Sequence, residues 1–307
     1  MSKKNEMTCL HRRLDAGKAA LLAEVPPPKS GDAAAMRAIA KVFGPKVHAL
    51  GVTDNQQEVR MSALAAASLA VGEGIEVILH VVTRDRNRIA LASDCLGAGA
   101  LGIRNVLCTT GTHQTLGRFR AARNVYDIDS VQLIQMYSNL SKNGSLVGED
   151  GIEALKPFYV GGVAAPFADP LELQVSRLAK KVKAGAKFLI TQPIFDLDRF
   201  AAWWNVVTQK GLHEKVAIIA GVRAMTSAAA AEAYAQRRPS PAMPETLLKR
   251  ISAKPGAQAQ AKQGVAIACE TIDKLRALAG LRGFDISAEG DCLAALAVIE
   301  AAGLKVD

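Results

Sequence analysis

The stretch KAGAKFLITQPIFD, residues 183–196, contains the pattern that decides the fold. A short apolar run from Phe188 to Gln192 lies between two longer amphipathic segments, Leu171 to Ala184 and Asp196 to Thr208. The short run predicts a buried strand, and the longer segments predict helices on either side of it. Strands that alternate with helices in this way form parallel sheets, because a parallel pair of strands needs a long crossover connection.

The same alternation continues in both directions along the chain. Eight apolar runs predict strands, namely Ala20 to Glu24, Val47 to Thr53, Glu76 to Val82, Asn105 to Thr109, Phe158 to Ala164, Phe188 to Gln192, Val216 to Gly221 and Gly283 to Ser287. Further amphipathic segments at Ala33 to Phe43, Gln56 to Val71 and Arg86 to Ala98 predict helices between them. Eight repeats favour a closed α/β barrel, the (β/α)8 TIM barrel, over an open sheet. We expect a single domain over residues 1–307, in which residues 1–18 form an N-terminal extension.

Two connections are long enough to hold extra helices, after strands four and seven. The first, Gly111 to Lys156, contains a predicted helix near Asp129 to Asn139. The second, Met225 to Ala279, contains two or three helices. Its predicted breaks are at Pro239, Pro241, Pro244 and Pro255. Neither connection is long or apolar enough to form a separate domain.

Composition and charge exclude several classes of protein. Half of the 307 residues are apolar, which is too many for a disordered chain. The formal net charge is +9, but the basic residues are scattered and have no aromatic residues between them. This distribution argues against nucleic-acid binding and leaves an anionic small ligand or a solvated basic surface.

The cysteines and the lengths of the apolar runs predict the metal content and the cellular location of the protein. Five cysteines without a Cys-x-x-Cys pair argue against a disulfide framework and against a structural zinc site, so we expect no metal. No run approaches the ~18 apolar residues of a membrane span, and the basic N-terminus lacks the apolar core of a signal peptide. We therefore expect a cytoplasmic protein with no membrane partner.

Polar residues gather where the predicted strands end, which is where barrels of this kind build their active sites. These positions are Glu24, Thr53, Asp54, His80, Thr110 to His113, Ala164 to Phe167, Gln192, Arg223 and Ser287 to Glu289. Glu24 is followed by a stiff turn with three prolines, so it is either a partly desolvated general acid at the mouth or a solvated strand-end glutamate. Gln192 offers an amide that can pair with both the donor and the acceptor edges of a heterocycle.

Two further segments could hold a cofactor. The segment CTTGTH, from Cys108 to His113, offers Gly111 and backbone N–H groups for the close approach of a planar cofactor or a phosphate, although it matches no dinucleotide or phosphate-loop fingerprint. Lys180 and Lys181, with Arg177 one helical turn earlier, form a basic face that could bind a pyrophosphate or merely face water.

Several of these segments, taken in order, resemble the methylenetetrahydrofolate reductase family from about Leu22 to Ser287. They are AEVPPPK at Ala23, GVTDN at Gly51, HVVTRDRNR at His80, GIRNVLCTTG at Gly102, VYDIDSVQL at Val125, GVAAP at Gly162, KKVKAGAKFLITQPIFD at Lys180 and IIAGV at Ile218. The resemblance implies an oxidoreductase that interconverts 5,10-methylenetetrahydrofolate and 5-methyltetrahydrofolate in one-carbon metabolism and methionine biosynthesis. It implies FAD as the cofactor, with FMN or no flavin as alternatives. The implied partners are a folate, a nicotinamide or another electron carrier, and further subunits of a homo-oligomer or a complex.

The resemblance also assigns roles to individual residues. Glu24 matches the acid that protonates the folate, and Gln192 matches the glutamine that binds the pterin. Thr110 and Gly111 belong to the matched loop after the fourth strand. The positions that touch the flavin, its ribityl chain or its phosphates in relatives are Thr53, His80, Tyr126, Asp129, Ala165, Arg177 and Lys181.

The chain departs from the family pattern at the expected reaction centre. Thr112 stands where the family usually has an aspartate near the flavin's pyrimidine edge and the folate. Gln174 replaces an acidic residue on the phosphate side, and Pro193 replaces an aromatic residue after the glutamine. A neutral Thr112 relieves the charge that opposes flavin reduction, which favours the oxidation of methyltetrahydrofolate, unless Asp54 or Glu289 supplies the missing charge. Thr112 also leaves open a non-catalytic folate-binding or complex-forming subunit, against which the retained Glu24 and Gln192 count.

Overall fold

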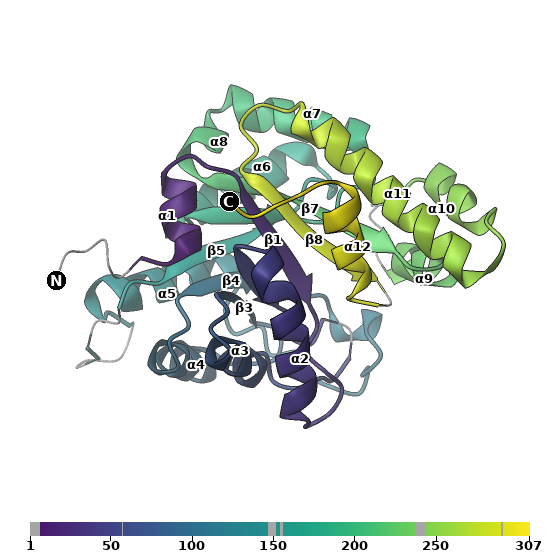
Figure 1. The fold of residues 1–307 in the computed structure, drawn as a ribbon. Coiled ribbons are helices and arrows are strands. Elements are labelled where there is room, and N and C mark those ends of the chain that lie inside the picture. Colours follow the sequence, from purple (N-terminus) through teal and green to yellow (C-terminus); the bar gives the residue numbers. More distant parts are fainter. Residues whose placement is uncertain (1–6, 57, 147–151, 154–155, 238–242, 290) are drawn as a thin grey trace.

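The fold is a closed barrel of eight parallel strands, seen in a computed structural model that describes residues 7–307 except 57, 147–151, 154–155, 238–242 and 290 (Figure 1). Each strand pairs with the next in sequence, and β8 pairs with β1 to close the ring. The strands are β1 (Ala20–Val25), β2 (Ala49–Val52), β3 (Val77–Val82), β4 (Asn105–Thr109), β5 (Tyr159–Ala164), β6 (Phe188–Thr191), β7 (Ala217–Met225) and β8 (Gly283–Glu289). The predicted TIM barrel is confirmed.

Helices surround the barrel (Figure 1). They are α1 (Cys9–Asp15), α2 (Ala33–Phe43), α3 (Ala63–Gly72), α4 (Arg88–Ala100), α5 (Ser130–Asn143), α6 (Leu171–Ala184), α7 (Leu197–Gln209), α8 (Leu212–Lys215), α9 (Ala228–Arg237), α10 (Glu245–Ser252), α11 (Gly256–Arg276) and α12 (Ala294–Ala301). Two short 3-10 helices, η2 (Gly44–Lys46) and η3 (Gln114–Leu116), complete the described elements. The helix predicted near Asp129 to Asn139 is α5, and the two or three helices predicted between Met225 and Ala279 are α9, α10 and α11.

Most boundaries follow the sequence pattern, and two differ for identifiable reasons. The helix predicted from Gln56 begins only at Ala63, because Asn55 has a φ of 39° and the following segment instead hydrogen-bonds to the turn after β1. The seventh strand continues beyond its predicted end to Met225, since it keeps pairing with β8 up to Glu289. Pro244 and Pro255 cap α10 and α11 as predicted breaks, whereas Pro239 and Pro241 lie outside the described residues.

Large apolar side chains fill the interior of the barrel near the starts of the strands. The cluster comprises Leu10, Leu14, Ala20, Leu22, Ala49, Ile78, Leu107, Tyr159, Phe188, Ile190 and Ile219. The ring of Phe188 fits there because Gly161 has no side chain; a Cβ at Gly161 would lie 2.4 Å from the ring. Tyr159 stacks on Phe188 with ring centroids 5.3 Å apart. This end of the barrel is therefore a packed core.

Helix α1 covers that end. Its Leu10 and Leu14 are buried in the interior cluster, and His11 stacks on Tyr159 with ring centroids 4.2 Å apart. The Glu76 carboxylate accepts hydrogen bonds from the backbone N–H groups of Cys9 (2.7 Å) and Leu10 (2.9 Å). The helix lies in the predicted N-terminal extension, whose residues 1–6 lie outside the described part. That division of the chain stays a prediction.

Candidate active site

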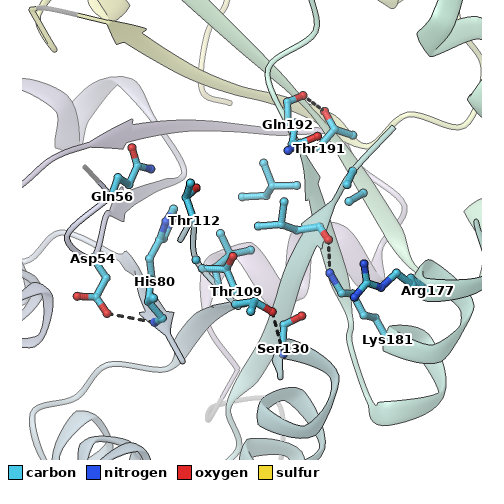
Figure 2. A pocket seen from close by; sticks show the side chains of 18 of the residues that line it. Asp54, Gln56, His80, Thr109, Thr112, Ser130, Arg177, Lys181, Thr191 and Gln192 are labelled. Carbon is cyan, nitrogen blue, oxygen red and sulfur yellow. Dashed lines mark hydrogen bonds between the residues drawn. The ribbon is translucent and has the colours of Figure 1, made fainter. Parts of the chain in front are cut away.

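A cavity of about 410 Å³ opens at the opposite end, where the strands finish (Figure 2). That volume lies within the range of ~300–1,000 Å³ typical of small-molecule sites. Its floor includes Leu107 and Ile190 of the apolar interior. Ten of the predicted site residues line it, namely Glu24, His80, Thr110, Gly111, Thr112, Asp129, Ala165, Arg177, Lys181 and Gln192.

Two predicted residues are not among those that line the cavity. Thr53 is buried in the strand-end layer, and its backbone N–H donates to Val25 O at 3.1 Å. Tyr126 adopts a φ of 45° and lies beside His113, with ring centroids 6.3 Å apart. A direct contact of either side chain with a ligand in this cavity stays a prediction.

Glu24 lies at the end of β1 and faces hydrogen-bond donors. Its Oε1 accepts from Nη2 of Arg223 at 2.7 Å and from Nε2 of Gln56 at 3.2 Å. Its side chain is only 15% exposed, which excludes the solvated glutamate that the sequence also allowed. A cation at this distance favours the charged form of a carboxylate. Glu24 is thus partly desolvated, as predicted, but it is also ion-paired.

Arg223 is a site residue to which sequence reasoning gave no role. Its side chain is 6% exposed, and it donates from Nε to Ser287 Oγ at 2.9 Å and from Nη1 to Glu289 at 3.3 Å. The guanidinium also lies 5.6 Å from the ring centre of Tyr234. Burial works against its charge, but Glu24 and the other neighbours hold the pKa of Arg223 above its ordinary value. Its contact with Glu24 spans 199 residues of sequence, so no local pattern could reveal it.

His80 turns a polar ring toward the cavity from β3. The side chain is fully buried, and within the described residues its Nε2 atom has no hydrogen-bond partner. Burial lowers the pKa of His80, although the nearby Glu24 opposes that shift. A Cβ at Gly51 would lie 3.0 Å from this Nε2 atom. This Nε2 atom is itself buried, so it is enclosed by protein and does not face the open part of the cavity.

The loop after β4 is held in one shape by Arg84, a second residue that sequence reasoning missed. The buried Arg84 donates to Thr112 O at 3.0 Å and to Asn55 O at 2.7 Å, while Asp85 pairs with its other face. Gly111 has a φ of 85°, and a Cβ there would lie 2.6 Å from Val82. The loop therefore needs glycine at this position, and it holds Thr112 at the cavity wall.

The two acids that could replace the missing aspartate are both paired with arginines. Asp54 lines the cavity, but its carboxylate forms an ion pair with Arg86 and accepts from Val82 N at 3.1 Å. Glu289 pairs with Arg223 and is not among the lining residues. Neither acid restores an uncompensated negative charge beside Thr112.

Helix α6 places a cationic group on the far side of the cavity. Figure 2 shows Arg177 and Lys181 across from His80, Gln56 and Thr112. Lys181 donates from Nζ to Val163 O at 2.5 Å. Burial, with Arg177 nearby, lowers the pKa of Lys181 to about 8. The predicted basic face of α6 is therefore divided, because Lys181 lines the cavity while Lys180 is exposed to solvent.

The backbone around Gln192 is fixed by three hydrogen bonds. Gln192 N donates to Ala164 O at 2.9 Å. Thr191 Oγ1 donates to Gln192 O at 2.9 Å and accepts from Gly221 N at 2.9 Å. The side chain of Gln192 lines the same cavity as Glu24 and Arg223. An amide, a carboxylate and a guanidinium thus line the same cavity as Arg177 and Lys181.

Comparison with known proteins agrees with this architecture. The family model described as methylenetetrahydrofolate reductase matches residues 9–302. A solved structure described as an uncharacterized protein from Clostridium thermocellum that binds two copies of 5-methyl-5,6,7,8-tetrahydrofolic acid superposes with a TM-score of 0.68 at 13% identity, over 96% of this chain and 98% of that one. A 2,3-dimethylmalate lyase of the PEP mutase/isocitrate lyase superfamily covers 97% of this chain and 85% of its own at 15% identity, but its TM-score of 0.45 supports no argument. No curated protein sequence matches the chain.

Two further properties concern the described residues. None of their helices combines the length and the apolar character needed to cross a bilayer. Likewise, their His, Cys, Asp and Glu side chains form no group of three that could hold a metal ion.

Proposed function

Because the chain belongs to the methylenetetrahydrofolate reductase family, we propose that it is an oxidoreductase that interconverts 5,10-methylenetetrahydrofolate and 5-methyltetrahydrofolate. One observation carries the proposal. Glu24, Gln192 and Lys181, which come from three separate matched segments, line a single cavity. The related fold that binds 5-methyltetrahydrofolate supports a folate as the ligand class.

The residues of the cavity fit a flavin dinucleotide. Lys181 and Arg177 offer two cations for its phosphates at one side, and His80 is a further polar residue that lines the cavity. Thr110, Gly111 and Ala165 have small side chains or none, which leaves room in the cavity for a planar ring. When bound, FAD supplies the carrier that accepts or gives up a hydride, whereas the protein supplies binding and orientation. FMN, which has one phosphate where FAD has two, is the alternative cofactor.

The chain's own residues then have distinct tasks. Gln192 binds the pterin edge through its amide, and Glu24 holds or moves the proton at N10 of the folate. Lys181 and Arg177 bind the phosphates. Arg84 keeps the Thr112 loop in place beside the reacting groups. A nicotinamide or another carrier exchanges electrons with the site, and we place the protein in a homo-oligomer or a complex.

The visible absorption spectrum of the purified protein tests this proposal. We expect a flavin spectrum that NADH or 5-methyltetrahydrofolate bleaches under anaerobic conditions. A protein that neither retains nor takes up FAD, yet binds 5-methyltetrahydrofolate, would instead be a non-catalytic folate-binding subunit, the role for which the neutral Thr112 is the sequence argument. Failure to bind any folate would overturn both assignments.

A further inference from the structure

Four ionisable groups meet on three adjacent strands at the mouth of the barrel. We call Glu24 of β1, Arg223 of β7, and Asp285 and Glu289 of β8 the mouth cluster. Arg223 forms ion pairs with Glu24 at 2.7 Å and with Glu289 at 3.3 Å. Asp285 adds a third carboxyl group near the same guanidinium, so the protonation of each carboxyl depends on its burial and on its pairing with Arg223.

The register of the strands places Asp285 below the other members. Asp285 is aligned with Leu22 of β1 and with Gly221 of β7, so Glu24 and Arg223 each lie two residues further toward the mouth. Residues two apart in a strand point to the same side, which puts Asp285 in the barrel interior beneath the ion pair. Its side chain is buried. Burial raises the pKa of Asp285 well above its usual range, and Glu24 raises it further while Arg223 opposes.

The groups that face Glu24 divide into donors and carboxyls. Arg223 from β7 and Gln56 from the segment before α3 both donate to its Oε1 atom. His80 from β3 is neutral because burial lowers its pKa. Of the carboxyl groups of Glu24, Asp285 and Glu289, that of Asp285 on β8 is the most buried. Glu289, also on β8, has its own contact with Arg223. We therefore infer that Asp285 is the carboxyl that stays protonated, and that Glu24, which is paired with Arg223, is the one that is ionised.

We propose that Arg223 is a positioning residue that holds Glu24 as a carboxylate, so that the site accepts a proton from its folate and oxidises 5-methyltetrahydrofolate. The inference rests on the proposed function and deepens it by naming a positioning residue and the direction of the reaction. It assigns Asp285 as the carboxyl that stays protonated beneath the pair.

The chemistry balances in this direction. A C–H bond of the N5 methyl group breaks, both of its electrons leave with the hydrogen as a hydride, which a bound flavin would accept, and an N5 iminium remains on the folate. The lone pair of N10 attacks the methylene carbon while the π electrons return to N5, which closes the ring. N10 then releases its proton to the Glu24 carboxylate. The opposite direction requires Glu24 to start protonated, a state that the ion pair with Arg223 disfavours.

Infrared spectra of the purified protein at pH 7 test which carboxyl holds the proton, independently of turnover. We expect a band from a protonated carboxyl that disappears in Asp285→Asn and persists in Glu24→Gln. Arg223→Met should add a second band that the further change Glu24→Gln removes, and Arg223→Lys should not add it. A wild-type band that disappears in Glu24→Gln would overturn the inference, even if the Arg223 variants do not fold.

The pH dependence of 5-methyltetrahydrofolate oxidation gives the second readout. A site that needs ionised Glu24 loses rate toward acid pH, and Arg223→Met should move that limb to higher pH, with a loss of about tenfold for each unit below the new midpoint. Arg223→Lys should restore most of the wild-type profile. An unmoved limb in Arg223→Met would contradict the role of Arg223. Absence of any folate turnover would overturn the proposed function while leaving the infrared assignment intact.

Discussion

The two ends of the barrel are built from the same strands but have opposite chemistry. At the closed end, Leu22, Ile78 and Phe188 pack beneath α1 in an apolar interior. Two residues further along their strands, the interior positions are Glu24, His80 and Ile190, and Gln192 follows on β6. The change from apolar to polar takes one step of the strand alternation on β1 and β3, and two steps on β6. Stability and ligand chemistry are therefore separated along each strand, and substitutions at the two ends should affect different measurements.

The largest expected effect is at the open end. Glu24→Gln should reduce folate turnover by ~10² to 10⁴, the usual loss for one acid–base group, because the amide cannot exchange the proton at N10. The flavin content should stay at its wild-type value, whereas loss of the ion pair with the buried Arg223 should lower the unfolding temperature. Steady-state kinetics beside thermal unfolding measure both. Near-normal turnover would show that Glu24 does not transfer the proton.

The matching change at the closed end is Leu10→Ala. It empties part of the interior cluster and should lower the free energy of unfolding by about 2–5 kcal/mol, with ligand affinity unchanged. Leu173→Ala is the control, because that leucine on α6 is 48% exposed and should change stability by less than about 0.5 kcal/mol. Denaturant titrations compare the two. Equal stabilities would mean that α1 does not seal the barrel.

A new charge at the open end should shift the flavin potential. Thr112→Asp places a carboxylate beside the reduced flavin and should lower the midpoint potential by some tens of millivolts, with ~90 mV as the ceiling. Because Asp54 and Glu289 are already paired with arginines, neither should mask the shift. Thr115→Asp, exposed on the same loop, is the control. A potential that stays constant or rises in Thr112→Asp would contradict this account.

The cationic side of the cavity should govern retention of the cofactor. Lys181→Ala should weaken flavin binding by roughly 10- to 100-fold, the worth of one or two charge-assisted hydrogen bonds. Lys183→Ala, exposed on the same helix, should leave binding unchanged. Flavin titrations of the apoprotein give both affinities. Equal flavin occupancy in the two variants would show that Lys181 does not bind the phosphates.

The smallest effect is a pH dependence of that affinity. The pKa of Lys181 is lowered to about 8, so the ammonium is charged below that pH and is lost as the pH rises through it. Flavin affinity should therefore fall by up to about tenfold between pH 7 and pH 9. Lys181→Ala should show a flat profile over the same interval. A wild-type profile that is flat as well would exclude Lys181 as a phosphate ligand.

The residues that sequence reasoning found and missed differ in how far away their partners lie. Glu24 and Gln192 end apolar strands, and the barrel rule then places them at one mouth. The roles of Arg84 and Arg223 could not be predicted from the sequence, because they depend on distant partners. The partners of Arg84 are 28 and 29 residues away, and Glu24 is 199 residues away from Arg223. The helix predicted from Gln56 begins later for the same reason, since the Arg60 side chain donates a hydrogen bond to Pro27 O in the turn after β1, 33 residues away. Periodicity reports which face is buried, but it does not report which distant groups share that face.

The seal at the closed end has a consequence for synthesis on the ribosome. Helix α1 is made before its partners Glu76 and Tyr159, and before Phe188, on which Tyr159 stacks. At ~5–20 residues per second, Leu10 and Leu14 wait on the order of ten to several tens of seconds before Phe188 is even added. During that interval Leu10 and Leu14 lack part of the interior cluster, and a segment of seven residues is too short to form a stable helix in water on its own. The α1 seal therefore closes only after more than half of the chain has been translated.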